Sequence, residues 1–385
     1  MKTLGIYIHI PFCMQKCLYC DFLSGPATGS VMERYVQALC GEMETEAIQY
    51  KEYRVGTVFL GGGTPSVLSG EQIRRIFACL QACFRIEPEA EITIEMNPGT
   101  VTKEKLDVCR AAGVGRISLG LQSGDDRELK ALGRVHTWEE FLRSYELCRQ
   151  AGFTQINVDL ISGLPGQTAG SWQDTLEKTA ALQPAHISAY SLIIEEGTPF
   201  YETYGEGRGT GALPDEVTEQ QIDQITKRFL ASQGYRRYEI SNYAKPGAEC
   251  RHNCLYWMRG NYAGFGLGAA SMVENRRWSN IRELDDYLMI RKREKTVGSC
   301  RAGEPYRLSL QEQMEEMMFL GLRMMQGVSC DKFLRCFGRS MEEIYGRVLE
   351  KHRAAGLLEY DGQAVWLTER GIDVSNYVLA DFLLS

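Results

Sequence analysis

Three cysteines lie within eight residues near the start of this chain, at Cys13, Cys17 and Cys20, with the spacing C-x3-C-x2-C. Thiolates this close together can hold one metal centre between them. A structural zinc site needs four ligands, typically as two separated pairs, and no second Cys/His pair follows at such a distance. A redox pair of Cys17 and Cys20 would leave Cys13 unexplained. A [4Fe–4S] cluster with three protein ligands uses all three thiolates and leaves one iron open to a small molecule.

The elements that must position these cysteines are predicted to alternate between strands and helices. Six short apolar runs, separated by segments of helical periodicity, occupy the first half of the chain. This alternation predicts parallel strands with crossover helices. Six units are too few for an eight-unit closed barrel, so we expect an α/β fold with a partial (β/α)6 barrel that is open on one side. The runs are residues 4–10, 57–65, 91–99, 116–123, 155–166 and 186–193.

Polar residues recur at alternate positions of these runs, and alternate residues face opposite sides of a strand. In the third run, Ile92 and Ile94 alternate with Thr93 and Glu95, and in the fifth run Asp159 is flanked by apolar residues. Burying such carboxylates without partners would cost on the order of several kcal/mol each. We therefore expect the polar faces to line an internal cavity that holds a large polar ligand. Hydrogen bonds to backbone and water are the alternative.

Three parts are expected along the chain: a barrel over residues 1–200, a linker and extension over 201–302, and a C-terminal domain over 303–385. In the last part, helical segments precede two apolar runs separated by Asp361-Gly362, a strong hairpin signal. Helices with one hairpin predict a winged-helix-like α+β domain. Such domains often bind nucleic acid, but this one carries nine Lys/Arg against thirteen Asp/Glu, a net charge of −4. We therefore expect no nucleic-acid binding.

Composition and charge limit the class of protein. The net charge is −7, and no apolar stretch of about 18 residues is present, so we expect no transmembrane helix. The apolar opening contains His9 and Pro11 and lacks a small-residue cleavage site, which favours a first strand over a signal peptide. Thirteen cysteines without a disulfide framework are typical of a reducing compartment, so we expect a cytoplasmic protein.

The second predicted strand ends in Gly-Gly-Gly-Thr-Pro at residues 61–65, where the glycines allow a ligand to approach the backbone closely. Together with C-x3-C-x2-C directly after a first strand, this pattern resembles the radical S-adenosylmethionine (SAM) superfamily. The resemblance implies a [4Fe–4S] cluster on Cys13, Cys17 and Cys20, with the amino and carboxylate groups of SAM on the open iron. It also implies that the reduced cluster can cleave SAM to methionine and a 5′-deoxyadenosyl radical.

A closer resemblance covers essentially the whole chain. The segments YIHIPFC, GGGTPS, LGLQS, LGRVHT, SGLPGQT and EEGTPFY occur in the same order as in oxygen-independent coproporphyrinogen III oxidase and its relatives. Glu95 and Asp159, on the predicted polar faces, are suitable partners for ribose hydroxyls, and His9 is expected to line the same cavity. The contacts to SAM that the resemblance implies are Tyr7, Tyr19, Gly62, Gly63, Thr64, Glu95, Gln122, Arg134 and Asp159, with Ile193 and Met272 added by alignment.

Within that family, the sequence RHNCLYW at residues 251–257 resembles the HNxxYW motif of heme chaperones of the HemW type. The resemblance implies that His252 is an axial ligand of heme iron, with Tyr256 and Trp257 packed against the macrocycle. Two alternatives stay open for His252: a polar loop residue that caps a helix, and a second metal site with the neighbouring cysteines. The other histidines are expected to be structural or solvated: His136, His186 and His352.

The oxidases of this family usually have a further cysteine two residues after the third and an N-terminal extension over the active site. Here Phe22 occupies that position, and six residues precede Tyr7. We therefore expect a heme chaperone that carries a [4Fe–4S] cluster, SAM and heme, and that delivers heme to heme-accepting proteins, with membrane-associated recipients among the candidates. The alternatives are a radical SAM decarboxylase of coproporphyrinogen III, another tetrapyrrole-modifying enzyme, and a structural or redox protein with a vestigial SAM site. The residues alone do not assign an enzymatic reaction.

Overall fold

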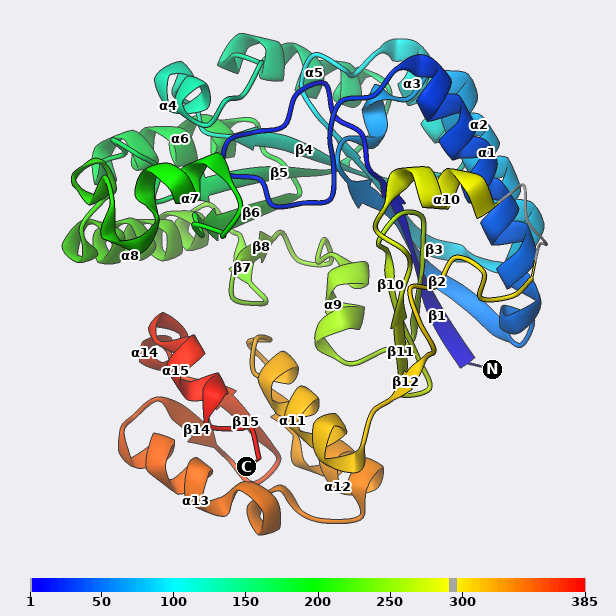
Figure 1. Ribbon diagram of the computed structural model, residues 1–385. Helices are drawn as coiled ribbons and strands as arrows, with labels where there is room; N and C mark the ends of the chain where they lie inside the picture. Colours follow the sequence, from blue (N-terminus) through cyan, green and yellow to red (C-terminus); the bar gives the residue numbers. More distant parts are fainter. Residues whose placement is uncertain (1, 291–295, 385) are drawn as a thin grey trace.

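The computed structural model describes residues 2–290 and 296–384 of the chain. Within these residues, twelve strands form one sheet in the order β12-β11-β10-β9-β1-β2-β3-β4-β5-β6-β8-β7. Its centre consists of six parallel strands, β1 to β6, with helices on the outer face (Figure 1). At the ends of this series, β1 pairs with β9 and β6 pairs with β8, so β1 and β6 do not close on each other. The predicted partial (β/α)6 barrel is confirmed.

The six central strands bury one face against the helices, because alternate side chains of a strand point to opposite sides. Ile6, Ile8 and Ile10 of β1 are fully buried in the main hydrophobic core. The strands are β1 (Lys2–Ile10), β2 (Tyr53–Gly62), β3 (Ile86–Met96), β4 (Arg116–Gln122), β5 (Gln155–Ser162) and β6 (His186–Ser191). The helices between them are α1 (Gly29–Glu46), α2 (Gly70–Cys83), α3 (Lys103–Ala111), α4 (Asp126–Ala131), α5 (Trp138–Gln150) and α6 (Ala169–Ala181).

Residues after β6 extend both edges of the sheet. At one edge lie β8 (Asn242–Ala244) and β7 (Arg236–Arg237), and at the other edge β9 (Tyr262–Phe265) pairs in parallel with β1. Between these two edges the chain forms the short helix α9 (Arg251–Trp257). The remaining elements are α7 (Pro199–Tyr204), α8 (Glu216–Ser232), β10 (Ala270–Val273), β11 (Arg276–Ser279), α10 (Leu284–Ile290) and β12 (Tyr306–Arg307).

The C-terminal part forms a separate hydrophobic core of its own. The predicted hairpin at Asp361-Gly362 joins β14 (Leu358–Tyr360) to β15 (Ala364–Leu367), and β13 (Val328–Ser329) adds a third strand. Helices α11 (Leu310–Gly321), α12 (Cys330–Phe337), α13 (Met341–Ala354), α14 (Glu369–Asp373) and α15 (Ser375–Ala380) surround this small sheet. Across residues 2–290 and 296–384, no helix is both long and apolar enough to cross a lipid bilayer.

A buried ion-pair cluster joins this domain to the barrel. Glu316 of α11 accepts a charged hydrogen bond from Arg259 Nε at 3.0 Å, and both side chains are 7% exposed. Arg277 of β11 reaches the other oxygen of Glu316 at 2.8 Å. Arg259 also donates to Asn275 Oδ1 at 3.1 Å. The domain is therefore fixed to the segment that contains α9, which lies between the barrel strands and α11 (Figure 1).

Candidate cofactor site

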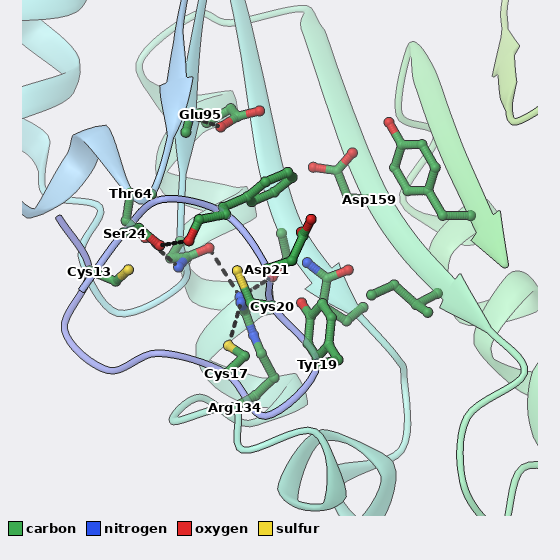
Figure 2. A pocket seen from close by; sticks show the side chains of 18 of the residues that line it. Cys13, Cys17, Tyr19, Cys20, Asp21, Ser24, Thr64, Glu95, Arg134 and Asp159 are labelled. Atoms are coloured by element: carbon green, nitrogen blue, oxygen red, sulfur yellow. Dashed lines mark hydrogen bonds between the residues drawn. The ribbon is translucent and has the colours of Figure 1, made fainter. Parts of the chain in front are cut away.

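A cavity of about 370 Å³ opens at the carboxyl ends of the central strands. The loop that follows β1 carries Cys13, Cys17 and Cys20 into its wall, beside the strands that carry Glu95 and Asp159 (Figure 2). In parallel α/β sheets, loops at the carboxyl ends of the strands meet at one edge, which is where ligands bind. The cavity therefore brings together the two chemical groups that the sequence singled out, the thiols and the carboxylates.

The three thiols of the loop are free, and the loop is held by backbone hydrogen bonds. Cys13 N–H donates to Gly25 O at 3.0 Å, and Leu18 N–H donates to Leu132 O at 3.1 Å. In the described residues, no three His, Cys, Asp or Glu side chains converge on one point as ligands of a single ion. The ligands of a cubane bind separate irons, so a cluster does not require such convergence. Three free thiols on a cavity wall thus fit the ligand set of a cluster.

Two interior carboxylates face the cavity with different partners. Asp159 accepts hydrogen bonds from Ser118 Oγ and Asn157 Nδ2, both at 2.8 Å. Glu95 accepts one from Gly62 N–H at 3.1 Å. Burial, together with the nearby Asp159, raises the pKa of Glu95 to about 8, and burial also raises the pKa of Asp159. Both carboxylates keep unused acceptor positions toward the cavity, which suits a ligand with hydroxyl or amino groups.

The raised pKa of Glu95 predicts how the stability of the cofactor-free protein depends on pH. The folded state binds the Glu95 proton more tightly than the unfolded state, in which the pKa of a glutamate is about 4.3. The free energy of unfolding should therefore fall between pH 5 and pH 9, by at most ~1.4 kcal/mol for each pKa unit of difference. Urea unfolding of the apoprotein at several pH values measures this. Glu95→Gln should weaken the dependence of the unfolding free energy on pH. An unchanged dependence in that variant would show that Glu95 is not its source.

Arg134 lies inside the site with an unsatisfied donor. Its guanidinium donates to Gly120 O at 2.7 Å and to Asn97 Oδ1 at 3.0 Å, and lies 3.6 Å from Cys17 Sγ. Its Nε–H is buried and has no hydrogen-bond partner in the described residues. A cation next to a cluster sulfur stabilises the thiolate form of the ligand. The orphaned donor is consistent with an acceptor on a bound ligand.

The glycine segment after β2 needs glycine for steric reasons. Gly62 has φ +108°, and a Cβ there would lie 2.4 Å from the ring of His9. A Cβ on Gly63 would lie 2.6 Å from Phe12 O. The N–H groups of Gly62, Gly63 and Thr64 donate to Glu95, Ile10 and Phe12 respectively. The segment can therefore offer carbonyl acceptors to a ligand, as an amino group requires, while its donors are used internally.

The cavity wall contains most of the predicted cofactor contacts. Gln122 reaches it from the end of β4, where a left-handed backbone (φ 76°) and a register irregularity change the direction of the strand. Ile193 lies at the mouth, with 67% of its surface exposed. The predicted residues in the wall are Cys13, Cys17, Cys20, Tyr19, Gly62, Gly63, Thr64, Glu95, Gln122, Arg134, Asp159 and Ile193.

Two residues that were predicted to contact SAM lie outside the cavity wall. Tyr7 lies deeper in the barrel, where its hydroxyl hydrogen-bonds His9 Nδ1 at 2.9 Å and its ring stacks on Phe59. Met272 is buried in β10, opposite Arg277. His9, expected in the wall, uses its second nitrogen on Leu23 O at 2.9 Å and supports the cysteine loop from behind.

His252 occupies the floor of the barrel, also outside the cavity wall. Its Nδ1 hydrogen-bonds Thr57 Oγ1 at 2.9 Å, and its Nε2 hydrogen-bonds the Tyr256 hydroxyl at 2.9 Å. The ring stacks on Phe59 at 5.3 Å between centroids and is 1% exposed. Burial lowers the pKa of His252 to about 3, so the imidazole is neutral. A neutral imidazole can ligate iron, but in this conformation neither nitrogen has a free lone pair or an open approach.

Parity placed two further lining residues, Ser118 and Tyr190, on the polar faces of the predicted strands, whereas Asn97 escaped the sequence reasoning. Asn97, directly after β3, accepts a hydrogen bond from Arg134. Ser118 of β4 donates a hydrogen bond to Asp159 of the neighbouring strand β5. Tyr190 contributes its ring from β6. Asn97 comes after the end of its strand, where parity no longer assigns a direction.

Comparison with known proteins agrees with this site. The Radical SAM superfamily description matches residues 7–179, and the HemN C-terminal domain description matches residues 308–374. The Heme chaperone HemW of Lactococcus lactis is 36% identical over 383 residues, covering 100% of this chain and 98% of the relative. That of Bacillus subtilis is 36% identical, with 98% of each chain covered. This chain belongs to the HemW family of radical SAM proteins.

Other relatives agree with that assignment. The HemW of Escherichia coli is 40% identical over 274 residues, which is 71% of each chain. Among solved structures, coproporphyrinogen III oxidase (HemN) from Escherichia coli has a TM-score of 0.86 and 24% identity, covering 99% of this chain and 90% of that one. At this identity the likeness shows a shared fold, including the C-terminal domain. Membership of the radical SAM superfamily implies a [4Fe–4S] cluster and SAM as cofactors.

Proposed function

We propose that this protein is a heme chaperone that holds a [4Fe–4S] cluster and SAM in its barrel, binds heme, and delivers it to heme-accepting proteins in the cytoplasm or at a membrane. The observation that carries this proposal is the match to HemW chaperones over the full length of the chain. The cavity supports the cofactor part, because three free thiols share one wall with two interior carboxylates and a partly satisfied arginine.

Different residues of this cavity would bind the cluster and SAM. Cys13, Cys17 and Cys20 would hold the cluster, and the carbonyls after β2 would accept from the amino group of SAM. Glu95 and Asp159 would accept from ribose hydroxyls with the lone pairs that no described protein group uses. When bound and reduced, the cluster supplies the electron that can cleave the sulfonium of SAM.

Binding of heme through His252 would require a local rearrangement of α9. The Tyr256 hydroxyl occupies Nε2, so iron can reach this nitrogen only after that hydrogen bond breaks. The bond to Thr57 would then fix the orientation of the ring from the other side, as hydrogen bonds do for metal-bound histidines. Competition between a hydroxyl and iron for one nitrogen gives a means of controlling heme release.

A hemin titration of the anaerobically reconstituted protein tests this function. The wild type should give a saturable Soret band. His252→Ala should lose that band or shift it strongly, because its iron ligand is gone. Tyr256→Phe keeps the ring but removes the competing hydroxyl, so it should bind hemin at least as tightly as the wild type. Equal binding by wild type and His252→Ala would exclude His252 as a ligand, and no saturable binding by the wild type would exclude the chaperone.

An oxidase assay separates the chaperone from the enzyme alternative. The reduced holoprotein is supplied with coproporphyrinogen III and SAM, and the products are followed by fluorescence after oxidation. We expect no protoporphyrinogen. Its formation at a rate that depends on Cys17 would replace the chaperone proposal with a decarboxylase.

A further inference from the structure

The interior carboxylate Asp159 is held by a chain of hydrogen bonds that leads away from the cofactor cavity. Asn157 Nδ2 donates to Asp159 Oδ1 at 2.8 Å, and Asn157 Oδ1 lies 2.6 Å from His186 Nδ1. The other nitrogen of this imidazole, Nε2, lies 2.9 Å from the Tyr238 hydroxyl. Parallel pairing of β5 with β6 places His186 directly beside Asn157, and both side chains are buried. The chain therefore runs from the cavity wall into the interior of the barrel.

The acceptor character of the carboxylate fixes the direction of every hydrogen bond in this chain. Ser118 Oγ donates to Asp159 Oδ2 at 2.8 Å, so both carboxylate oxygens accept, and the Asn157 amide turns its NH2 group toward Asp159. Its oxygen then faces His186, whose Nδ1 must carry the proton. Nε2 is left to accept from the Tyr238 hydroxyl. Burial lowers the pKa of His186 well below its usual value, so the ring is neutral and can hold this one tautomer.

The Asn157 amide has every hydrogen-bonding position engaged. Its Nδ2 donates one hydrogen to Asp159 and the other to Ser118 Oγ at 2.7 Å. Its Oδ1 accepts from His186 and also from Ser188 Oγ at 3.2 Å. Such an amide cannot rotate without leaving buried polar groups unpaired. The orientation of Asp159 is thus set in large part by side chains that lie behind the cavity wall.

We propose that His186 and Asn157 are positioning residues, which fix Asp159 in the orientation that accepts from the ribose hydroxyls of bound SAM. This inference rests on the proposed function, because SAM is the ligand that it concerns. Each oxygen of Asp159 receives a hydrogen bond from the protein and keeps a lone pair for a ligand. Glu95, the other interior carboxylate, accepts from Gly62 N–H. Asp159 is the more firmly held of the two, and an acceptor that is already oriented lowers the entropic cost of binding.

The outer end of the chain is anchored at two points. The Tyr238 hydroxyl oxygen accepts from the N–H of Cys250, the residue before α9, at 3.3 Å. The Tyr238 carbonyl accepts from Met325 N–H at 3.0 Å, and Met325 packs on the core of the C-terminal domain. His186 is therefore held on one side by the amide that it orients and on the other side by a tyrosine that cannot move freely.

Binding of labelled SAM to the reconstituted protein, measured by equilibrium dialysis, tests the positioning role. His186→Leu removes the donor to Asn157 and should weaken SAM binding roughly ten-fold, as expected for one buried hydrogen bond. His186→Asn places an amide N–H near the position of Nδ1 and should restore most of the affinity. Methionine lacks the ribose and should bind both variants like the wild type, measured by its effect on the EPR spectrum of the reduced cluster. Weaker methionine binding by His186→Leu would indicate a general disturbance of the site and would overturn the positioning role.

The control variant is His352→Leu, which removes a histidine that is equally buried but belongs to the C-terminal domain and does not line the cavity. It should bind SAM like the wild type. Equal weakening by His352→Leu and His186→Leu would point to general destabilisation and would overturn the positioning role.

A double-mutant cycle shows whether His186 acts through Asp159. If it does, His186→Leu should weaken SAM binding little when it is added to Asp159→Asn, because the carboxylate that it orients is already gone. Additive losses, or equal SAM binding by His186→Leu and the wild type, would overturn the positioning role and leave the chaperone function standing. If the wild type itself binds no SAM, the cofactor part of the proposed function fails.

The tautomer of His186 gives a measurement on the wild-type protein, which does not depend on whether His186→Leu folds. A ¹⁵N spectrum of the histidine-labelled, cofactor-free protein, assigned by comparison with His186→Asn, should show the proton on Nδ1. A proton on Nε2 would mean that the ring does not donate to Asn157, and the positioning role would be overturned.

Discussion

Replacing Cys17 by alanine is expected to remove the iron–sulfur cluster and, with it, the binding of SAM. Two remaining thiolates cannot hold a cluster that already lacks its fourth protein ligand. After anaerobic reconstitution, iron should fall from about four atoms per chain to near background, and the brown absorbance should disappear. Iron and sulfide assays measure the first result, and equilibrium dialysis with labelled SAM measures the second.

The matched control for this experiment is Cys336→Ala, which removes an exposed thiol in the C-terminal domain. That variant should keep its full iron content and SAM binding, because Cys336 lies on α12, far from the cavity wall. Full iron in Cys17→Ala would mean that another side chain replaces the third thiolate, and the assignment of the cluster ligands would fail. Loss of iron in both variants would point to general oxidation during reconstitution.

The second large effect is expected from Glu316→Ala, which removes the acidic centre of the interdomain cluster. Arg259 would keep its hydrogen bond to Asn275 but would remain 7% exposed without a counter-charge. Removal of one partner from a buried pair typically costs ~3–5 kcal/mol. We expect a lower melting temperature and faster hydrogen exchange in α9 and α11, measured by mass spectrometry.

An exposed ion pair in the same domain is the control for Glu316→Ala. Arg339 and Glu343 of α13 lie 3.5 Å apart, and both side chains are more than half exposed. Glu343→Ala should change stability by less than about 1 kcal/mol, because solvent screens such pairs. If Glu316→Ala is equally mild, the C-terminal domain is held by packing and the ion pairs contribute little.

The floor of the barrel connects α9 to the cofactor cavity through packed rings. Tyr7 stacks on Phe59, Phe59 stacks on His252, and His252 meets Tyr256 edge-on with 4.9 Å between ring centroids. Above this column, Tyr7 is hydrogen-bonded to His9, which touches the glycine segment and the cysteine loop. A change in the position of α9 would therefore alter the packing beneath the residues that support the cysteine loop.

Much of the cofactor site could be predicted from the sequence because its signals are local. The spacing of Cys13, Cys17 and Cys20 lies within one loop, and the two-residue period of a strand shows which side Glu95 and Asp159 face. These patterns need no knowledge of how distant segments pack. The open barrel also follows from a count of strand and helix units, since six units cannot complete a closed ring.

How deep a side chain lies within the barrel depends on the tertiary structure and could not be read from the sequence. Parity gives the side of the sheet on which Tyr7 lies, but its distance from the cavity depends on strand register and on the rings packed beneath it. His252 is in the floor because the segment after β8 enters the open end of the barrel, where Glu91 accepts its backbone N–H at 3.0 Å. Likewise, Lys332 donates to the Met258 carbonyl because two segments more than seventy residues apart in sequence meet, and no local pattern encodes such a meeting.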